Sequence, residues 1–179
     1  MRIEEINKWI NEGRTLPQDL TQEEKDHLTK LGWSVKEGWW DNGQKHFEWN
    51  YLHGKRHGKL EEWWENGQKL YERHFFHGKW HGKWEGWHKN GHKWYEENWL
   101  HGKDHGKWEG WWDNGQKQME WDYFHGKAHG KWKEWDFDYG SLIKEEEYLH
   151  GMRHGAWKEW NTKGKLTKDE EYFYGNRIK

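Results

Sequence analysis

The side chains with the widest chemical repertoire in this chain are its 15 histidines. Ten of them form pairs within the recurring pattern His-Gly-x-x-His-Gly. The pairs are His53/His57, His77/His81, His101/His105, His125/His129 and His150/His154. Imidazole nitrogens bind zinc and copper, but a two-histidine site needs further ligands, from Asp104 or from a neighbouring pair. The candidate metal ligands are His101, His105, His125 and His129. The simpler interpretation is that the pairs are polar turn residues copied with a repeat, so we expect no bound metal.

The same histidines could respond to pH, because imidazole titrates near a pKa of about 6.5. A row of such groups would become charged below neutral pH, so pH-dependent association is a hypothesis. Carboxylates also recur, as in Glu61/Glu62, but without a pocket that would raise a carboxyl pKa for acid–base catalysis. The sequence contains no glycine-rich phosphate loop, nucleophile elbow or metalloprotease motif. We therefore assign no catalytic residue, expect no cofactor and do not predict an enzyme.

These residues are positioned by a tandem repeat with a period of 24 residues. Its frame starts at Gly54, Gly78, Gly102, Gly126 and Gly151. One insertion lies near Tyr139, and a degenerate first copy occupies residues 30–53. Units of this length cannot bury their apolar surface alone and must stack on their neighbours. The predicted domains are an N-terminal helical cap at 1–32 and a repeat array at 33–179.

Composition indicates a thin structure held together by rings. Only 31% of the residues are hydrophobic and 35% are charged, but there are 20 tryptophans, 8 tyrosines and 6 phenylalanines. Each large ring can bury roughly 150–250 Å², and aromatic residues favour strands. The net charge of −2 gives no field to attract nucleic acid or an anionic membrane. Without cysteine, a signal-like segment or an apolar span, the chain is expected to be soluble and cytoplasmic, or part of a virion if its source is viral.

The strongest turn signal is Asn-Gly, once in each of four copies. It occurs at Asn42-Gly43, Asn66-Gly67, Asn90-Gly91 and Asn114-Gly115. Asn-Gly fits a two-residue type I′ turn, so each copy is predicted to be a β-hairpin, with strands at 107–113 and 116–124 in the fourth. The glycines beside the histidines turn the chain into the next hairpin. The fold prediction is mostly β: an elongated single antiparallel meander of about six hairpin repeats and about twelve strands, with a short helical cap.

Residues 1–32 do not repeat and are predicted to form two short helices. Apolar residues recur at helical spacing from Ile3 to Ile10, and Gly13 is a suitable stop. Thr21 and Glu24 form a capping-box pattern. The residues expected to face the first repeat are Trp9, Leu20, Leu28 and Leu31. The alternative is a separate hairpin of helices that binds a partner.

A two-residue turn divides the side chains of the fourth copy between two faces. One face carries Trp108, Gly110, Trp112, Met119, Trp121 and Tyr123. The other carries Lys107, Glu109, Trp111, Glu120 and Phe124. Like charges at Glu109 and Glu120 disfavour this register, so a bulged turn that shifts the facing is an alternative. In the last two copies the aromatic face receives Glu134, Asp136, Lys144 and Glu146, so its rings are expected to fade toward the carboxyl end.

One tryptophan slot is filled in all six copies. Its members are Trp39, Trp63, Trp87, Trp111, Trp135 and Trp160. The simplest interpretation is a structural ladder, in which Trp87→Ala or Trp111→Ala costs about 3–5 kcal/mol and Trp160→Ala clearly less. If the stripe is a binding surface instead, these changes should be nearly neutral for folding. The predicted interaction surface also includes Trp84, Trp108, Trp112 and Trp121.

The stretch Gly106-Lys-Trp-Glu-Gly-Trp-Trp-Asp-Asn-Gly-Gln-Lys117, followed by Gly126-Lys-Ala-His-Gly130, resembles the MORN repeat (membrane occupation and recognition nexus) in its variant form. The similarity extends over residues 34–175. The sequence departs from that pattern where the variant usually has leucine, at Lys45, Lys69, Lys93 and Lys117. The resemblance implies an elongated hairpin array that acts as a scaffold. Similar proteins include immunity components of bacterial toxin–antitoxin systems and proteins of large DNA viruses.

The expected function is that of a non-catalytic scaffold for protein–protein interaction, with a protein partner or a second copy of the chain on the aromatic face. A contiguous patch of rings on a soluble protein usually marks an interface. The alternatives are a carbohydrate-binding module that uses exposed tryptophan and an immunity protein that neutralises a toxin. Nucleic acid and membrane partners are not expected.

Overall fold

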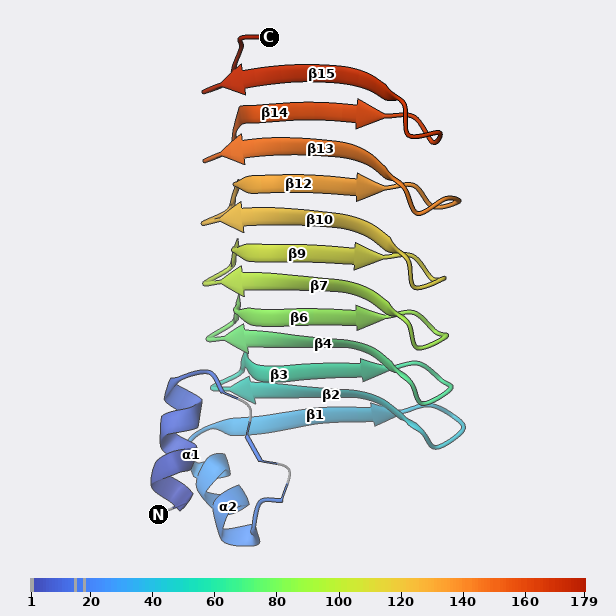
Figure 1. Ribbon diagram of the computed structural model, residues 1–179. Coiled ribbons are helices and arrows are strands. Elements are labelled where there is room, and N and C mark those ends of the chain that lie inside the picture. Colours follow the sequence, from blue (N-terminus) through green and yellow to red (C-terminus); the bar gives the residue numbers. More distant parts are fainter. Residues whose placement is uncertain (1, 15, 18) are drawn as a thin grey trace.

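The computed structural model describes residues 2–14, 16–17 and 19–179, and its main body is one antiparallel sheet (Figure 1). The long strands are β1 (Trp33–Trp39), β2 (Lys45–Leu52), β3 (Lys55–Trp63), β4 (Lys69–Phe76), β6 (Gly82–Trp87), β7 (Lys93–Leu100), β9 (Gly106–Trp111), β10 (Lys117–Phe124), β12 (Gly130–Trp135), β13 (Leu142–Leu149), β14 (Met152–Trp160) and β15 (Leu166–Phe173). The two-residue strands are β5 (Lys79–Trp80), β8 (Lys103–Asp104), β11 (Lys127–Ala128) and β16 (Asn176–Arg177). Each long strand pairs with the next one along the chain, which confirms the predicted meander.

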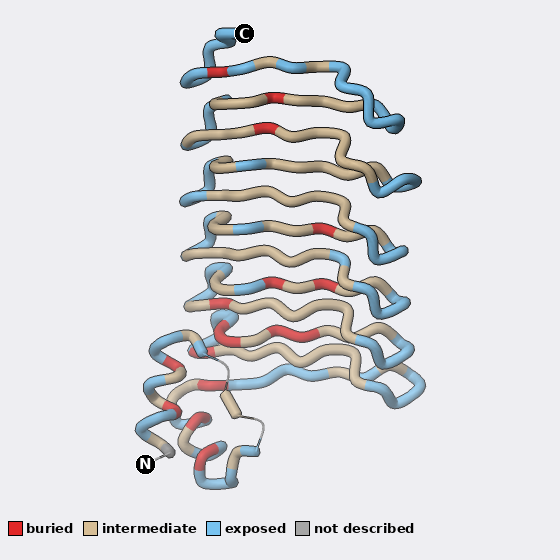
Figure 2. The backbone as a smooth tube through the Cα atoms, in the orientation of Figure 1, coloured by how far each residue is buried: buried red, intermediate tan, exposed pale blue. Residues whose placement is uncertain are grey.

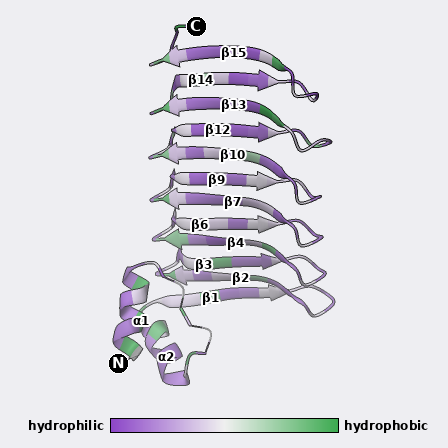
Figure 3. Cartoon of the chain, viewed as in Figure 1, coloured by the Kyte–Doolittle hydropathy of each residue, from purple (hydrophilic) through white to green (hydrophobic). Residues whose placement is uncertain are grey.

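The sheet is a single layer with little fully buried surface. Most strand residues have intermediate exposure (Figure 2), and hydrophilic residues dominate the strands (Figure 3). One buried cluster within the sheet joins Leu60, Phe75 and Trp84. Stability must therefore come mainly from contacts between neighbouring hairpins, as expected for a repeat array.

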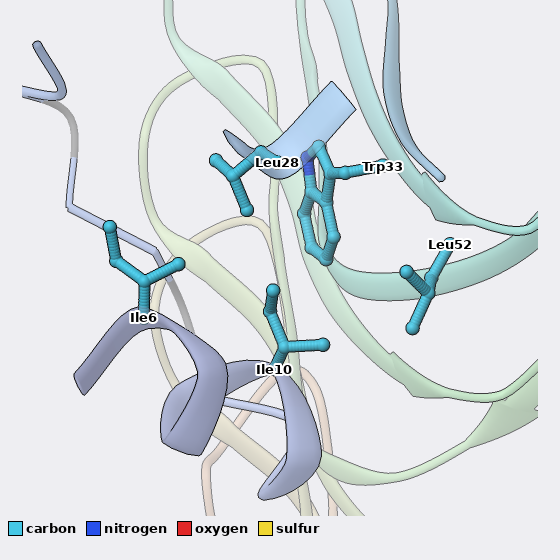
Figure 4. Packing of buried hydrophobic residues seen from close by; sticks show 5 residues of the cluster. All are labelled: Ile6, Ile10, Leu28, Trp33 and Leu52. Atoms are coloured by element: carbon cyan, nitrogen blue, oxygen red, sulfur yellow. The ribbon is translucent and has the colours of Figure 1, made fainter. Parts of the chain in front are cut away.

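Two helices cover the β1 end of the sheet, α1 (Arg2–Asn11) and α2 (Gln22–Lys30). The predicted capping box of α2 is present, with the Thr21 and Glu24 side chains each bonded to the other's backbone amide. A buried cluster joins the helices to the sheet through Ile6, Ile10, Leu28, Trp33 and Leu52 (Figure 4), and Trp9, Leu20 and Leu31 pack against it. Neither helix is long and apolar enough to cross a membrane, a finding that covers the described residues.

The Asn-Gly turns do not have the predicted type I′ geometry. In the fourth copy only Gly115 is left-handed (φ 83°), whereas Asn114 keeps a negative φ. The Gly115 amide donates to the Trp112 carbonyl at 2.9 Å, and the Trp112 amide donates to the Gln116 carbonyl at 2.9 Å. This is a type I turn followed by a left-handed glycine, which closes a three-residue loop. The type I′ prediction at Asn-Gly is wrong because a second turn type also suits this dipeptide.

Type I′ geometry occurs instead at the His-Gly pairs. Phe124 pairs with Lys127, and the two residues between them, His125 and Gly126, have φ values of 51° and 82°. The equivalent histidines, also left-handed, are His53, His77, His101 and His150. Histidine is not among the residues that usually signal a type I′ turn, whereas Asn-Gly is, so the sequence pattern favours this turn type at the other end of the hairpin.

The strand register nevertheless follows the prediction. Trp108 pairs with Trp121, and Glu109 pairs with Glu120. The three-residue loop shifts the register by one position, and a bulge between Lys117 and Met119 shifts it back. The predicted pairing of like charges is therefore present, and the alternative of a bulged turn that shifts the facing is wrong, because the bulge and the longer loop cancel. The same register shift lies beside the stripe tryptophan of every other copy.

Candidate interaction surfaces

One face of the sheet carries an unbroken row of aromatic rings, here called the ring ladder. Its members are Phe75, Trp84, Trp99, Trp108, Tyr123, Trp132, Tyr148, Trp157 and Tyr172. Successive ring centroids lie 4.9–5.6 Å apart, with interplanar angles of 42–59°. The spacing follows from the separation of neighbouring strands, about 4.8 Å. Tilted rings at this distance attract one another beyond the area that they bury.

Four of the five ladder tryptophans are also tied to the backbone of the preceding strand. The indole nitrogens of Trp84, Trp108, Trp132 and Trp157 donate to carbonyl oxygens ten residues earlier, at 2.9–3.2 Å. The expected fading of the rings toward the carboxyl end is wrong. The polar residues there occupy other slots, with Glu134 opposite Lys144 and Asp136 in the lengthened loop. Glu146 lies opposite Trp132 without displacing it from the ladder.

The other tryptophans predicted for this face lie beside the ladder or beyond it. Trp121 stacks on Trp132, with centroids 4.9 Å apart and an interplanar angle of 19°. Trp112 lies past the end of β9 and meets Phe137 edge-on at 5.3 Å. The three-residue loop begins directly after it, and its place on the aromatic face stays a prediction.

The opposite face carries a row of carboxylates, here called the carboxylate row. Its members are Glu37, Glu48, Glu61, Glu72, Glu85, Glu96, Glu109 and Glu120. Each lies directly across from the next one. Like charges that oppose one another destabilise a sheet, so this row requires cations close by.

Those cations come from the lysines that stand where the MORN variant usually has leucine. Lys69 Nζ lies 2.6 Å from both Glu61 Oε1 and Glu72 Oε2. Burial disfavours the charged form of Lys69, but hydrogen bonds to these two carboxylates and their charge outweigh burial and raise the lysine pKa. Lys45, Lys93 and Lys117 each bridge two carboxylates of their own copy in the same way.

The lysine slot and the carboxylate row change together in the last two copies. The continuation of the row there holds Lys133 and Lys158, which alternate with Glu145 and Asp169 across the strands. The slot opposite the stripe tryptophan then holds leucine, Leu142 and Leu166, in place of lysine. Lysine at this slot therefore compensates for glutamate in the row.

The six-copy tryptophan stripe lies beside the carboxylate row. Lys69 Nζ is 5.7 Å from the ring centroid of Trp87, and Lys93 Nζ is 5.6 Å from that of Trp111. Such distances allow a cation–π attraction between copies. Within the described residues, Trp63, Trp87 and Trp111 contact lysines, and no two stripe rings contact each other, so the row of ring-on-ring contacts is on the opposite face.

Neighbouring copies are also linked along the Asn-Gly edge. The Asn42 side-chain amide donates to the Glu65 carbonyl at 2.7 Å, and the Trp40 indole donates to the Trp63 carbonyl at 3.0 Å. The next two copies repeat both links. The fourth copy does not, because the following loop is longer, and the buried Trp112 indole nitrogen has no hydrogen-bond partner among the described residues.

At the His-Gly edge, histidines from neighbouring pairs come together. Ring centroids are 5.0 Å apart for His81 and His101, and 5.1 Å for His105 and His125. His129 similarly contacts His150 at 5.0 Å. The candidate metal ligands His101 and His105 thus belong to different ring pairs. Over the described residues, no group of three or more histidines and carboxylates is arranged to hold a metal ion.

His57 joins this edge to the helical cap and is expected to make it sensitive to acid. Its Nε2 donates to the Ile10 carbonyl at 2.9 Å, and its Nδ1 accepts from the His77 amide at 3.3 Å, so the ring is neutral. Complete burial and the neighbouring His77 lower the pKa of His57. A histidine with a depressed folded pKa loses its contribution as pH falls below its unfolded pKa.

We therefore expect the denaturant midpoint to fall between about pH 7 and pH 5, and to fall less in His57→Gln, whose side chain does not titrate. His46→Gln is the matched control, because His46 stacks on Trp40 away from the cap. An equal acid response in wild type and His57→Gln would refute the assignment.

Comparison with known proteins agrees with this geometry. A family model described as MORN repeat variant matches residues 56–77, 80–101 and 104–125. No curated protein matches the chain. Each matched stretch runs from just after one His-Gly turn, through the Asn-Gly loop, to the histidine of the next turn. Residues 56–125 are therefore three consecutive MORN repeats of the variant type, set within a longer array of hairpins.

Proposed function

We propose that the protein is a non-catalytic scaffold that binds a protein partner, or a second copy of itself, through the ring ladder. MORN repeats are commonly non-catalytic repeat scaffolds. The observation that supports this proposal is that the ladder rings between Trp99 and Tyr148 stay half-exposed, while the two helices lie at the β1 end (Figure 1). A continuous, partly exposed strip of rings on one face is the kind of surface that proteins use for association.

A charge placed on this face without loss of the fold tests the proposal. Trp121→Glu is suitable, because the same slot holds Glu97, Glu146 and Glu170 in other copies. We expect wild type to self-associate in light scattering, or to cross-link to a partner through the ladder, and Trp121→Glu to lose that association. The control is Thr162→Glu, which adds the same charge in an exposed turn. A wild type that neither self-associates nor cross-links to a partner through this face would contradict the proposal.

A further inference from the structure

The third copy differs from the others at two exposed positions. Trp80 takes a slot that holds Arg56, Asp104, Ala128 and Arg153 elsewhere. Trp94 takes a slot that holds His46, Leu70, Gln118, Ile143 and Thr167 elsewhere. These two tryptophans are 40% and 45% exposed. Because the other copies form the same hairpin without tryptophan at either slot, the architecture does not require these two side chains.

Both tryptophans line one groove on the ring-ladder face. The groove has a volume of about 430 Å³, within the range of roughly 300–1,000 Å³ that small-molecule sites occupy. Trp80 contacts Trp99 edge-on at 4.3 Å and Trp84 at 4.8 Å, so ladder rings hold it in place. Trp94 is the extra residue of the bulge between Lys93 and Tyr95, and Tyr95 also lines the groove.

The close approach of Tyr95 depends on Gly86 directly opposite. A Cβ at Gly86 would lie 2.3 Å from the Tyr95 ring. Real Cβ atoms do not come that close to another atom, so glycine lets the tyrosine ring lie flat over β6. The bulge and this glycine together place two neighbouring rings, Trp94 and Tyr95, in one groove.

The groove also holds one cation and one carboxylate. Arg73 lies over the Trp84 ring at 4.8 Å and donates Nη2 to the Tyr95 hydroxyl at 2.9 Å. Glu97 accepts from the Trp99 indole at 3.1 Å, and burial raises its pKa. Arg73 already occupies the cation position over the Trp84 ring, so its charge disfavours a cationic ligand there. The guanidinium can donate and the carboxylate can accept further hydrogen bonds beside apolar ring surfaces.

We propose that this groove binds a neutral carbohydrate, with sugar rings stacked on Trp80 and Trp94 and hydroxyl groups bonded to Arg73 and Glu97. Hydroxyl groups donate and accept, so one ligand can serve both charged groups. An extended peptide would lack its usual backbone partners, because the strands beneath the groove are paired on both sides. The groove shares Trp99 and Trp108 with the ring ladder, but sugar binding does not require protein association.

The test is calorimetric titration of the full chain with short neutral oligosaccharides of glucose, mannose, galactose and N-acetylglucosamine in the millimolar range. At least one series should bind. Trp80→Arg and Trp94→Leu, which place residues found in other copies, should each weaken binding about tenfold or more and leave the melting temperature unchanged. The control is Trp39→Ala, which removes a 56% exposed tryptophan outside the groove and should change affinity less than about twofold.

Two results would overturn the inference. The first is the absence of binding by every series, and the second is binding that both groove variants leave intact. A proline-rich peptide that binds where no sugar does would also overturn it and assign the groove to peptide recognition. Loss of protein association in Trp121→Glu has no bearing on this outcome, since sugar binding is measured on the isolated chain.

Discussion

Replacing Trp84 with alanine is expected to lower the free energy of unfolding by about 3–5 kcal/mol, the usual cost of deleting a large buried ring. Trp84 is only 6% exposed, packs against Phe75 and Trp99, and donates its indole N–H to the His74 carbonyl at 3.1 Å. The variant loses these ring contacts and the indole hydrogen bond, while the His74 carbonyl keeps its bond from the His81 amide at 3.0 Å. Denaturant melts followed by circular dichroism would measure the loss.

Two further tryptophans of the sheet make this experiment specific. Trp94→Ala removes a ring that is 45% exposed in the same copy, and should change stability by less than about 0.5 kcal/mol. For Trp111→Ala the structure now favours a loss smaller than at Trp84, because lysine ammonium groups rather than rings lie over it, at 4.9 and 5.6 Å. A loss at Trp111 equal to that at Trp84 would contradict the assignment of the main ring packing to the ladder.

The meander itself was predictable, because its signals are local and repeated. Alternating side chains and a fixed period determine that Trp108 lies opposite Trp121, provided that the turn and the bulge add no net shift. The turn type was not predictable in this way. Asn-Gly suits both a two-residue and a three-residue loop. The bonds that accompany the longer loop, such as Asn42 to the Glu65 carbonyl, exist only when copies stack.

The interaction surfaces were predictable only in part, for a similar reason. Aromatic residues on one face could be read from the sequence, but the ladder depends on which rings of neighbouring hairpins come within about 5 Å of each other. The histidine contacts likewise join adjacent pairs, as in His81 with His101. One signal was available in the sequence and was missed. Comparison of the copies slot by slot shows that Trp80 and Trp94 depart from the repeat.

The second large effect on stability is expected at the carboxylate row, for the variant Lys93→Leu. This variant places at residue 93 the leucine that the last two copies carry in the same slot. Lys93 Nζ lies 2.7 Å from Glu85 Oε1 and also bonds Glu96, and the three side chains are 19–29% exposed. The contribution of a partly buried ion pair to stability lies between those of exposed and fully buried pairs. We therefore expect Lys93→Leu to lower the free energy of unfolding by about 1–3 kcal/mol at neutral pH. The same hairpin forms with leucine at this slot in Leu142 and Leu166, so the loss measures charge rather than shape.

The double variant Glu85→Lys/Lys93→Leu should recover at least half of that loss, because it reproduces the fifth copy, where Lys133 Nζ lies 3.6 Å from Glu145.

The pH dependence of the stability gap gives an independent check. Burial opposes ionisation of Glu96, but Lys83 and Lys93 outweigh it and lower the Glu96 pKa. A carboxylate with a depressed folded pKa stabilises the fold above its usual pKa of 4.5, and this contribution disappears as pH falls. The stability gap between wild type and Lys93→Leu should therefore narrow between about pH 5 and pH 3. A gap that stays constant with pH, together with a double variant no more stable than Lys93→Leu, would show that the lysine acts through packing and not by compensating the carboxylate row.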